Sequence, residues 1–247
     1  MAAEGRGRGG GVLVVDLGGK NVKCWHSVTS ERRKAPSGPA FTPEAMVAAV
    51  REITAGWAYD AVSLGVPAPV RDDRVTRQPV NLGPGWVGFD FGAALGVPTR
   101  VMNDAVMQAR GSYAGGRMLF LGLGTGLGTT LIADGVAIGM EMGHLPYVER
   151  YTFEDCVGQR GLDRLGKKRW LRAVRDVTAR LRAAVVAEYV VLGGGNAKLL
   201  PSDDQPLPEW CRLGDNNLAF AGGLRAWDDA ATTAASDAAP PPAAAAA

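Results

Sequence analysis

The stretch from Leu119 to Thr130 places four glycines at every second position between two apolar runs. The apolar residues before the glycines and the β-branched residues after them predict two strands joined by a tight turn. Glycine lacks a Cβ atom, so its backbone adopts positive φ angles and can approach a ligand closely. The amides of such a turn form an anion-binding nest, to which the Thr125 hydroxyl adds a donor. A β-hairpin that binds nothing fits the same pattern, so the stretch alone does not establish a phosphate site.

A second segment, from Val12 to Trp25, repeats this pattern with a carboxylate at the turn. A buried strand ends at Asp16, then Gly18 and Gly19 follow, and a second strand begins. An aspartate at this point can hold Mg²⁺ through water while the glycine amides meet phosphate. A turn built from an acid and glycines, with no ligand, is an equally good interpretation of this segment.

The chain between the two hairpins predicts an α/β unit. Thr42, Pro43 and Glu44 are typical of a helix start, and the helix should end near Thr54. A buried strand over residues 61–66 follows, and then a long irregular section that contains Asn81. Loops of this length inside a domain tend to be functional.

Two further segments present polar side chains at the ends of short elements. A strand over 99–102 delivers Asn103 and Asp104 at its C-terminal end, which is where ligands bind in open α/β sheets. The same pair is also an ordinary helix N-cap. Glu141 and His144 suit hydrogen bonding to sugar hydroxyls, although an ordinary surface loop explains them as well.

The second half of the chain adds a basic helix and a third glycine turn. Residues 160–182 carry nine arginines and lysines against two aspartates, with apolar residues at helical spacing. This predicts an amphipathic helix whose charged side is either solvated or a track for a polyanion. A buried strand over 190–192 then ends at Gly193 and Gly194, where a turn can approach a nucleotide or simply connect a strand to a helix.

Composition narrows the class of protein. The 247 residues are 47% hydrophobic and 21% charged, as expected for one large or two small folded domains. No apolar run has the length of a membrane span, and the first residues lack a signal-peptide core, so we expect a cytoplasmic protein with no membrane partner. Three widely spaced cysteines and two histidines argue against a disulfide framework and a structural zinc site.

These motifs together resemble the sugar kinase/actin/heat-shock ATPase superfamily. More narrowly, the chain resembles ROK-family sugar kinases, particularly the branch that contains polyphosphate glucokinases. The resemblance runs from Val12 to Trp227 and is carried by short motifs at residues 16–19, 103–104, 122–126, 141–144 and 192–195.

The resemblance implies an α/β fold with two domains, of the actin-like ATPase (ribonuclease H-like) type, with a cleft between the domains. The expected first domain covers residues 12–114 and the second 115–216, and a C-terminal helix over 217–227 returns to the first domain. Residues 1–11 and 228–247 are expected to be disordered tails, because their composition cannot bury enough apolar surface to offset the entropy of ordering.

The resemblance also implies roles for individual residues. Asp104 would be the general base that takes the proton from the attacking sugar hydroxyl, and Asp16 would position Mg²⁺ through water. The expected sugar-binding residues are Asn81, Asn103, Asp104, Glu141, His144 and Glu154. The expected donor-phosphate residues are Gly18, Gly19, Lys20, Gly124, Thr125, Gly126, Gly193 and Gly194.

Three departures from the family pattern refine these expectations. Lys20 stands where the family has threonine or serine, so a hydroxyl donor is replaced by a long cation that either binds a phosphate chain or crowds the metal site. No cysteine-rich zinc motif follows His144, which makes this histidine a sugar contact. Residues 1–11 are too short for the helix-turn-helix of the family's repressors, so no DNA binding is expected.

The sequence therefore predicts a ROK-type hexokinase or glucokinase that phosphorylates the 6-hydroxyl of a hexose, with glucose as the expected sugar. The donor is ATP, polyphosphate or both, Mg²⁺ is the cofactor, and the family suggests a homodimer. The alternative is a catalytically weak or inactive relative that binds a sugar or polyphosphate as a sensor.

Overall fold

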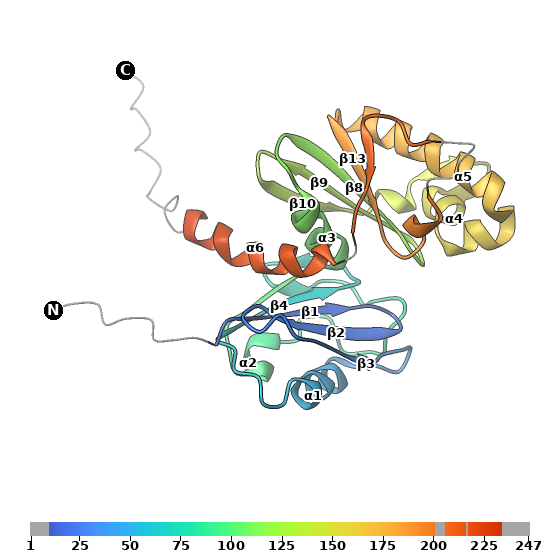
Figure 1. The fold of residues 1–247 in the computed structure, drawn as a ribbon. Helices are drawn as coiled ribbons and strands as arrows, with labels where there is room; N and C mark the ends of the chain where they lie inside the picture. Colours follow the sequence, from blue (N-terminus) through green and yellow to red (C-terminus); the bar gives the residue numbers. More distant parts are fainter. Residues whose placement is uncertain (1–9, 201–205, 216, 234–247) are drawn as a thin grey trace, which may run out of the picture.

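The computed structural model describes residues 10–200, 206–215 and 217–233. It contains two five-stranded mixed sheets, one above the other (Figure 1). The first sheet has the strand order β3-β2-β1-β4-β7, in which β1, β4 and β7 run parallel and β2 and β3 are antiparallel to their neighbours. Its strands are β1 (Val12–Leu17), β2 (Asn21–His26), β3 (Arg32–Pro36), β4 (Ala61–Val66) and β7 (Thr99–Asn103).

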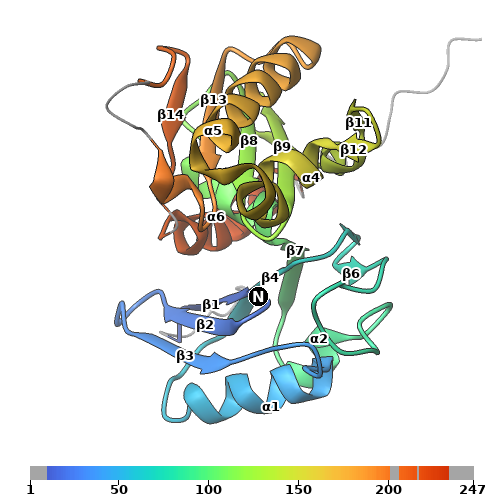
Figure 2. The same cartoon turned by 90° about the vertical axis from the view of Figure 1, so that its right-hand side faces the viewer.

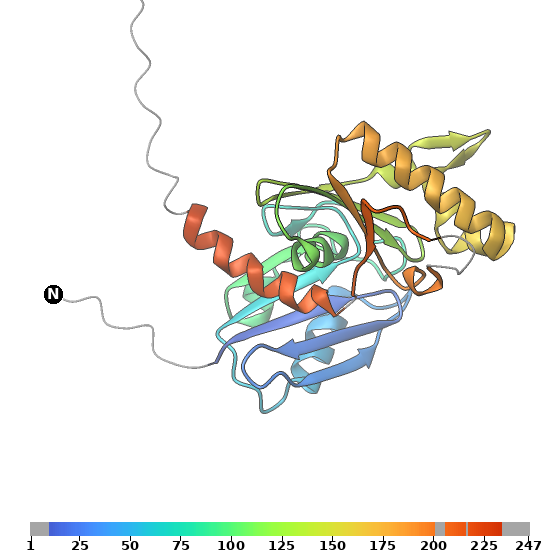
Figure 3. The ribbon, with the colours of Figure 1, turned by 45° about the horizontal axis from the view of Figure 1, so that its top comes forward.

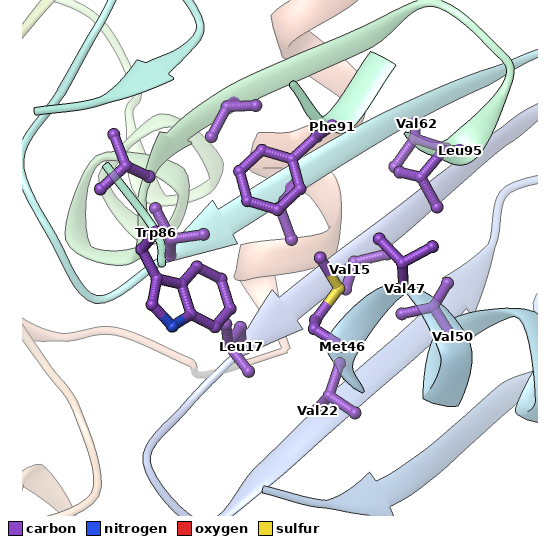
Figure 4. Packing of buried hydrophobic residues seen from close by; sticks show 14 of the residues in the cluster. Val15, Leu17, Val22, Met46, Val47, Val50, Val62, Trp86, Phe91 and Leu95 are labelled. Atoms are coloured by element: carbon purple, nitrogen blue, oxygen red, sulfur yellow. The ribbon is translucent and has the colours of Figure 1, made fainter. Parts of the chain in front are cut away.

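One face of the first sheet is covered by α1 (Pro43–Ile53) and α2 (Phe91–Leu95). Thr42 caps α1 as expected, because its side chain accepts a hydrogen bond from the amide of Ala45. Apolar side chains from the strands, the two helices and the loop residue Trp86 fill the space between them (Figure 4). A small hairpin of β5 (Val70–Arg71) and β6 (Arg74–Val75) lies in the loop after β4.

The second sheet has the order β10-β9-β8-β13-β14 and contains the glycine-rich stretch as the turn between β8 and β9. Its strands are β8 (Arg117–Leu123), β9 (Leu127–Ala133), β10 (Val136–Met140), β13 (Tyr189–Gly193) and β14 (Cys211–Leu213). A second apolar core lies between this sheet and the helices α4 (Phe153–Val157) and α5 (Gln159–Ala184). The remaining elements are a hairpin of β11 (Pro146–Val148) and β12 (Tyr151–Thr152) and two 3₁₀ turns, η1 (Met142–His144) and η2 (Ala197–Leu199).

Two helices, α3 (Asp104–Ser112) and α6 (Leu218–Thr233), lie between the sheets (Figure 2). Helix α6 crosses the first sheet over β1 and β4, and α3 packs on β9 and β10 of the second sheet (Figure 3). The helices touch backbone to backbone: a Cβ atom at Gly222 would lie 1.8 Å from the carbonyl oxygen of Met107. Only glycine, which has no Cβ atom, allows α3 and α6 to approach each other this closely.

Most of the expected strands and helices occur in the structure, but α2, β14 and the β11–β12 hairpin were not predicted, and three further points differ. Helix α6 continues to Thr233, so the tail expected from residue 228 is helical at its start; residues 1–9 and 234–247 lie outside the described part. Strand β3 was not expected, because its alternating sequence exposes Arg32 and Lys34 and has no apolar run. The basic segment lies in α5, which consists of two helical pieces that meet at a kink, where Gly166 is not helical (φ 72°).

The three cysteines are free and buried, which agrees with the expected lack of a disulfide framework. Burial raises the pKa of the Cys24 thiol to about 12 and that of Cys211 to about 11. Among the described helices, none combines the length and apolar character that crossing a bilayer requires.

Candidate active site

The turn between β1 and β2 carries the first expected phosphate loop, and hydrogen bonds hold it in place. The amide of Gly18 donates to the carbonyl oxygen of Asn21 (2.9 Å), and the hydroxyl of Ser37 donates to the carbonyl oxygen of Gly18 (2.6 Å). The Gly18 amide is therefore used inside the turn. A ligand would meet the amides that follow, those of Gly19 and Lys20, which line a cavity of about 560 Å³.

The glycine turn between β8 and β9 is held by the start of α5. The amide of Gln159 donates to the carbonyl oxygens of Gly124 (2.9 Å) and Thr125 (3.2 Å). The side-chain amide of Asn196 reaches the carbonyl of Gly124 at 3.3 Å. These bonds fix the loop before any ligand arrives, and such preorganisation lowers the entropy lost on binding.

The two glycines of the third turn, Gly193 and Gly194, have different roles. Gly193 ends β13, and a Cβ atom there would lie 2.5 Å from the ring of Phe120, so this glycine serves close packing and lines none of the cavities. Gly194 has φ 84° and lines a cavity of about 330 Å³ together with Gly195.

Asn103 ends β7 and acts as the N-cap of α3. Its side-chain oxygen accepts from the amide of Ala105 (2.9 Å), and its side-chain nitrogen donates to the carbonyl of Ala68 (3.2 Å). The residue lines a neighbouring cavity of about 370 Å³, which it shares with Glu141. The capping interpretation of the Asn-Asp pair is therefore correct for Asn103, whatever else it contacts.

Asp104 follows as the first residue of α3 and lines the 330 Å³ cavity with the glycines of the β8–β9 turn. The residue as a whole is half-buried, and its carboxylate accepts a hydrogen bond from the amide of Ala105 (2.8 Å). Burial, together with the negative charge of Asp16, raises the pKa of Asp104 to about 7. A carboxylate with this proton affinity can take a proton near neutral pH more effectively than an ordinary aspartate.

Glu141, His144 and Glu154 lie together along a cavity of about 550 Å³. His144 Nε2 is 3.3 Å from Glu141 Oε2. Glu154 Oε2 accepts from the amide of Leu127 (3.2 Å), and its Oε1 lies 3.4 Å from the guanidinium of Arg160. These carboxylates and the imidazole are hydrogen-bonding groups of the kind that bind sugar hydroxyls.

The cavities of about 560, 550 and 330 Å³ form one cleft, since Asn81 of the first domain and Thr125 of the second line all three. Most of the expected site residues border this cleft. They are Gly18, Gly19, Lys20, Asn81, Asp104, Gly124, Thr125, Gly126, Glu141, His144, Glu154 and Gly194.

Several residues that border the cleft were not identified from the sequence as site residues. They are Lys23, Arg77, Gln78, Gln159, Arg160 and Asn196. Gln159 and Asn196 bond to each other at 3.1 Å, and each directly follows a glycine at a turn into a helix, which was an available signal. The sequence does not mark Lys23 as a site residue, because it is an ordinary exposed position in a strand whose residues alternate between buried and exposed.

Asp16 lies buried at the end of β1, and Lys23 is its direct neighbour on β2. The ammonium nitrogen of Lys23 is 3.0 Å from Asp16 Oδ2, and Lys23 lines the 560 Å³ cavity. Asp16 itself lines none of the cavities described above, because Lys23 lies at its carboxylate.

The family resemblance of the sequence implies Mg²⁺, and the carboxylate of Asp16 is a group that could hold it. Magnesium in phosphoryl-transfer sites is held by one or two carboxylates together with substrate phosphates and water. Asp16 offers one such carboxylate, and it already holds a cation, the Lys23 ammonium. No group of three or more metal-ligating side chains occurs in the described ranges.

Sequence comparison identifies no relative: no protein-family model matches the chain, and no curated protein matches it. The structure does match solved proteins. One is an inorganic polyphosphate/ATP-glucomannokinase from Arthrobacter sp. strain KM, with a TM-score of 0.75 at 22% identity, over 89% of this chain and 98% of that one. Another is a ROK family glucokinase from Streptomyces griseus, solved with glucose and AMPPNP, with a TM-score of 0.65 at 17% identity, over 87% and 98%.

A third match is a ROK family transcriptional regulator described as a homolog of the E. coli MLC protein. Its TM-score is 0.64 at 15% identity, over 87% of this chain and 78% of that one. At these identities the matches show the fold, which is the two-domain actin-like fold of ROK proteins, and they confirm the predicted fold class. Because the same fold serves kinases and a regulator, function has to be argued from the cleft.

Proposed function

We propose that this chain, which has the fold of the ROK-family sugar kinases, transfers a phosphoryl group to the 6-hydroxyl of a hexose. The observation that carries the proposal is the position of Asp104, a carboxylate with a pKa of about 7 that borders the same cavity as the glycine turns of both domains. Phosphoryl transfer requires positioning and charge neutralisation together with a group that accepts the hydroxyl proton.

On the acceptor side, Asp104 takes the proton from the attacking hydroxyl. Asn81, Glu141, His144 and Glu154 border the adjoining cavity and hold the remaining hydroxyls. The Leu127 amide and the Arg160 guanidinium hold the Glu154 carboxylate in place. We include Asn103 as an indirect contributor, because its cap fixes the start of α3 and hence the place of Asp104.

On the donor side, the amides of Gly19, Lys20, Thr125 and Gly126 face the phosphates, and Gly194 contacts the more distant part of the donor. When bound, Mg²⁺ would supply charge neutralisation at the transferred phosphoryl group. Asp16 would hold that ion through water.

We propose polyphosphate, alone or in addition to ATP, as the donor and glucose as the acceptor. The support is the charge of the donor cavity, which Lys20 and Lys23 line. Lys20 makes no ion pair among the described residues and is exposed, so it is free to contact a phosphate chain instead of crowding Asp16. The structurally similar Arthrobacter protein is named as a kinase of both donors.

The direct test incubates purified protein and Mg²⁺ with glucose and either ATP or polyphosphate, and measures glucose 6-phosphate. We expect product with at least one donor. Lack of product with both donors, in a preparation that still binds glucose, would reject the kinase function and favour a sensor that binds sugar or polyphosphate. The lysines at positions 20 and 23 are the observation that supports the sensor function.

The proton affinity of Asp104 predicts the pH dependence of the reaction. The pKa of about 7 lies above the usual value for aspartate, so the base form is lost as the pH falls through 7. We expect kcat/KM to fall about tenfold per pH unit below pH 7 and to level off above it, since it reports ionisations of the free enzyme. The residual activity of Asp104→Ala should lack this slope, and a profile flat from pH 5 to pH 8 in the intact protein would contradict the assignment.

Replacing Lys20 with threonine tests the departure from the family motif. Lys20→Thr removes a cation from the donor cavity and restores the hydroxyl, so we expect KM for polyphosphate to rise several-fold with little change in kcat. The variant should also show weaker dependence of KM on salt, because one phosphate contact is lost. A large increase in kcat would instead show that Lys20 impairs the native enzyme.

A further inference from the structure

A row of three charged side chains crosses the first sheet beside the donor cavity. Asp16 on β1 is paired in register with Lys23 on β2, and Lys23 is paired with Lys34 on β3. Residues paired directly across strands have their side chains on the same face. One carboxylate thus stands at the end of a row that continues with two ammonium groups.

The two lysines of this row differ in their surroundings. Lys23 contacts Asp16 at 3.0 Å and lines the donor cavity, whereas Lys34 is exposed, has no ion pair among the described residues and borders no cavity described here. Like charges directly opposite each other on neighbouring strands repel, so Lys34 favours the Lys23 position closer to Asp16.

The Lys23 ammonium can readily exchange Asp16 for another anionic partner. The Lys23 side chain is 50% exposed and that of Asp16 only 12%, so the carboxylate is fixed while the ammonium keeps access to water. Ion pairs with such an exposed partner contribute little net free energy. A lysine ammonium on a flexible stem can therefore leave the carboxylate for another anion at small cost.

A metal ion at Asp16 and the Lys23 ammonium would use the same carboxylate. Lys23 approaches Oδ2, and two cations placed on one aspartate repel each other strongly in a partly buried site. The cavity that Lys23 lines is the place where the donor phosphates would lie. A phosphate chain there offers Lys23 a second anionic partner that needs no movement of the backbone.

We propose that Lys23 exchanges partners: it occupies Asp16 in the free protein and moves to the donor phosphate when Mg²⁺ arrives with the donor. The inference rests on the proposed function for the identity of the donor, but not for the exchange itself. Lys23 then has two measurable effects of opposite sign. It weakens metal binding to the free protein, and it strengthens binding of the phosphate chain.

The test uses Lys23→Met, which keeps the length and apolar stem of the side chain but removes its charge. Binding of Mn²⁺, as a stand-in for Mg²⁺, is measured on the full chain without donor or sugar by the electron paramagnetic resonance of free Mn²⁺. We expect the variant to bind Mn²⁺ several-fold more tightly than the wild type. Binding of inorganic tripolyphosphate with Mg²⁺, measured by calorimetry, should weaken about tenfold through loss of a charge-assisted contact.

Lys34→Met is the matched control, because it removes the same charge one strand further out, beyond contact with Asp16 or the cavity. It should change both affinities by less than about twofold. The proposal is overturned if Lys23→Met leaves Mn²⁺ affinity unchanged or lowers it, if tripolyphosphate binding is unaffected, or if Lys34→Met gives the same changes. Since neither measurement involves turnover, a protein without kinase activity would reject the proposed function and leave this test intact.

Discussion

Asp104→Ala is expected to lower kcat for sugar phosphorylation by roughly 10²–10⁴-fold, the usual contribution of a positioned general base. The carboxylate begins α3 and borders the cavity where both glycine turns meet, so its loss removes the proton acceptor without altering the donor loops. Its raised pKa also means that the side chain is destabilised in its charged form, so the variant should not unfold.

The measurement is steady-state formation of glucose 6-phosphate with the better donor, alongside glucose affinity and circular dichroism. Asp134→Asn is the matched control, because Asp134 lies in an exposed hairpin turn with φ 52°, which asparagine tolerates. It should retain full activity. Near-normal turnover in a correctly folded Asp104→Ala protein would remove Asp104 from the role of base.

Gly222→Ala is expected to lower the free energy of unfolding by about 1–3 kcal/mol, the typical cost of forcing an extra group into a packed interface. The new Cβ atom would lie 1.8 Å from the Met107 carbonyl oxygen, so α3 and α6 must move apart. Gly111→Ala makes the reciprocal clash with the Leu218 carbonyl oxygen and should behave alike. Because α3 begins at Asp104, we also expect loss of kcat with both variants.

Thermal unfolding followed by circular dichroism measures the stability change, with Gly92→Ala as the control. Gly92 is also helical, but a Cβ atom there would lie 3.5 Å or more from its nearest neighbours, which is an ordinary contact. Alanine should therefore leave stability unchanged or raise it by about 0.5–1 kcal/mol through helix propensity. Equal melting temperatures for the two variants would show that the helix crossing has room for a methyl group.

The parts of the fold that the sequence predicts well are those with strong local patterns. The apolar strands before Asp16 and before the 122–128 glycines, and the Thr42-capped helix, occur where the residues indicate. Most of the expected site residues border one cleft, but Asp16, Asn103 and Gly193 do not. Local periodicity and turn chemistry are sufficient for these features.

What the sequence does not predict depends on contacts between distant segments. Gln159 holds the Gly124 turn, and Gly222 meets Met107, through approaches that no local pattern encodes. Lys23 is a different case: strand pairing places it beside Asp16, but its own position in the sequence does not mark it as a site residue. Gly193 shows the opposite case: a motif glycine whose local pattern indicates a ligand but whose space is taken by Phe120.

The buried thiols give this chain a native means of following each domain separately. Cys24 lies in the core of the first domain, and Cys156 and Cys211 lie in that of the second; none is more than 8% exposed. A thiol reagent can therefore modify each cysteine only in molecules whose surrounding core has opened. Mass-resolved alkylation of the unmodified protein would consequently distinguish a chain that opens as one cooperative unit from one whose halves open independently.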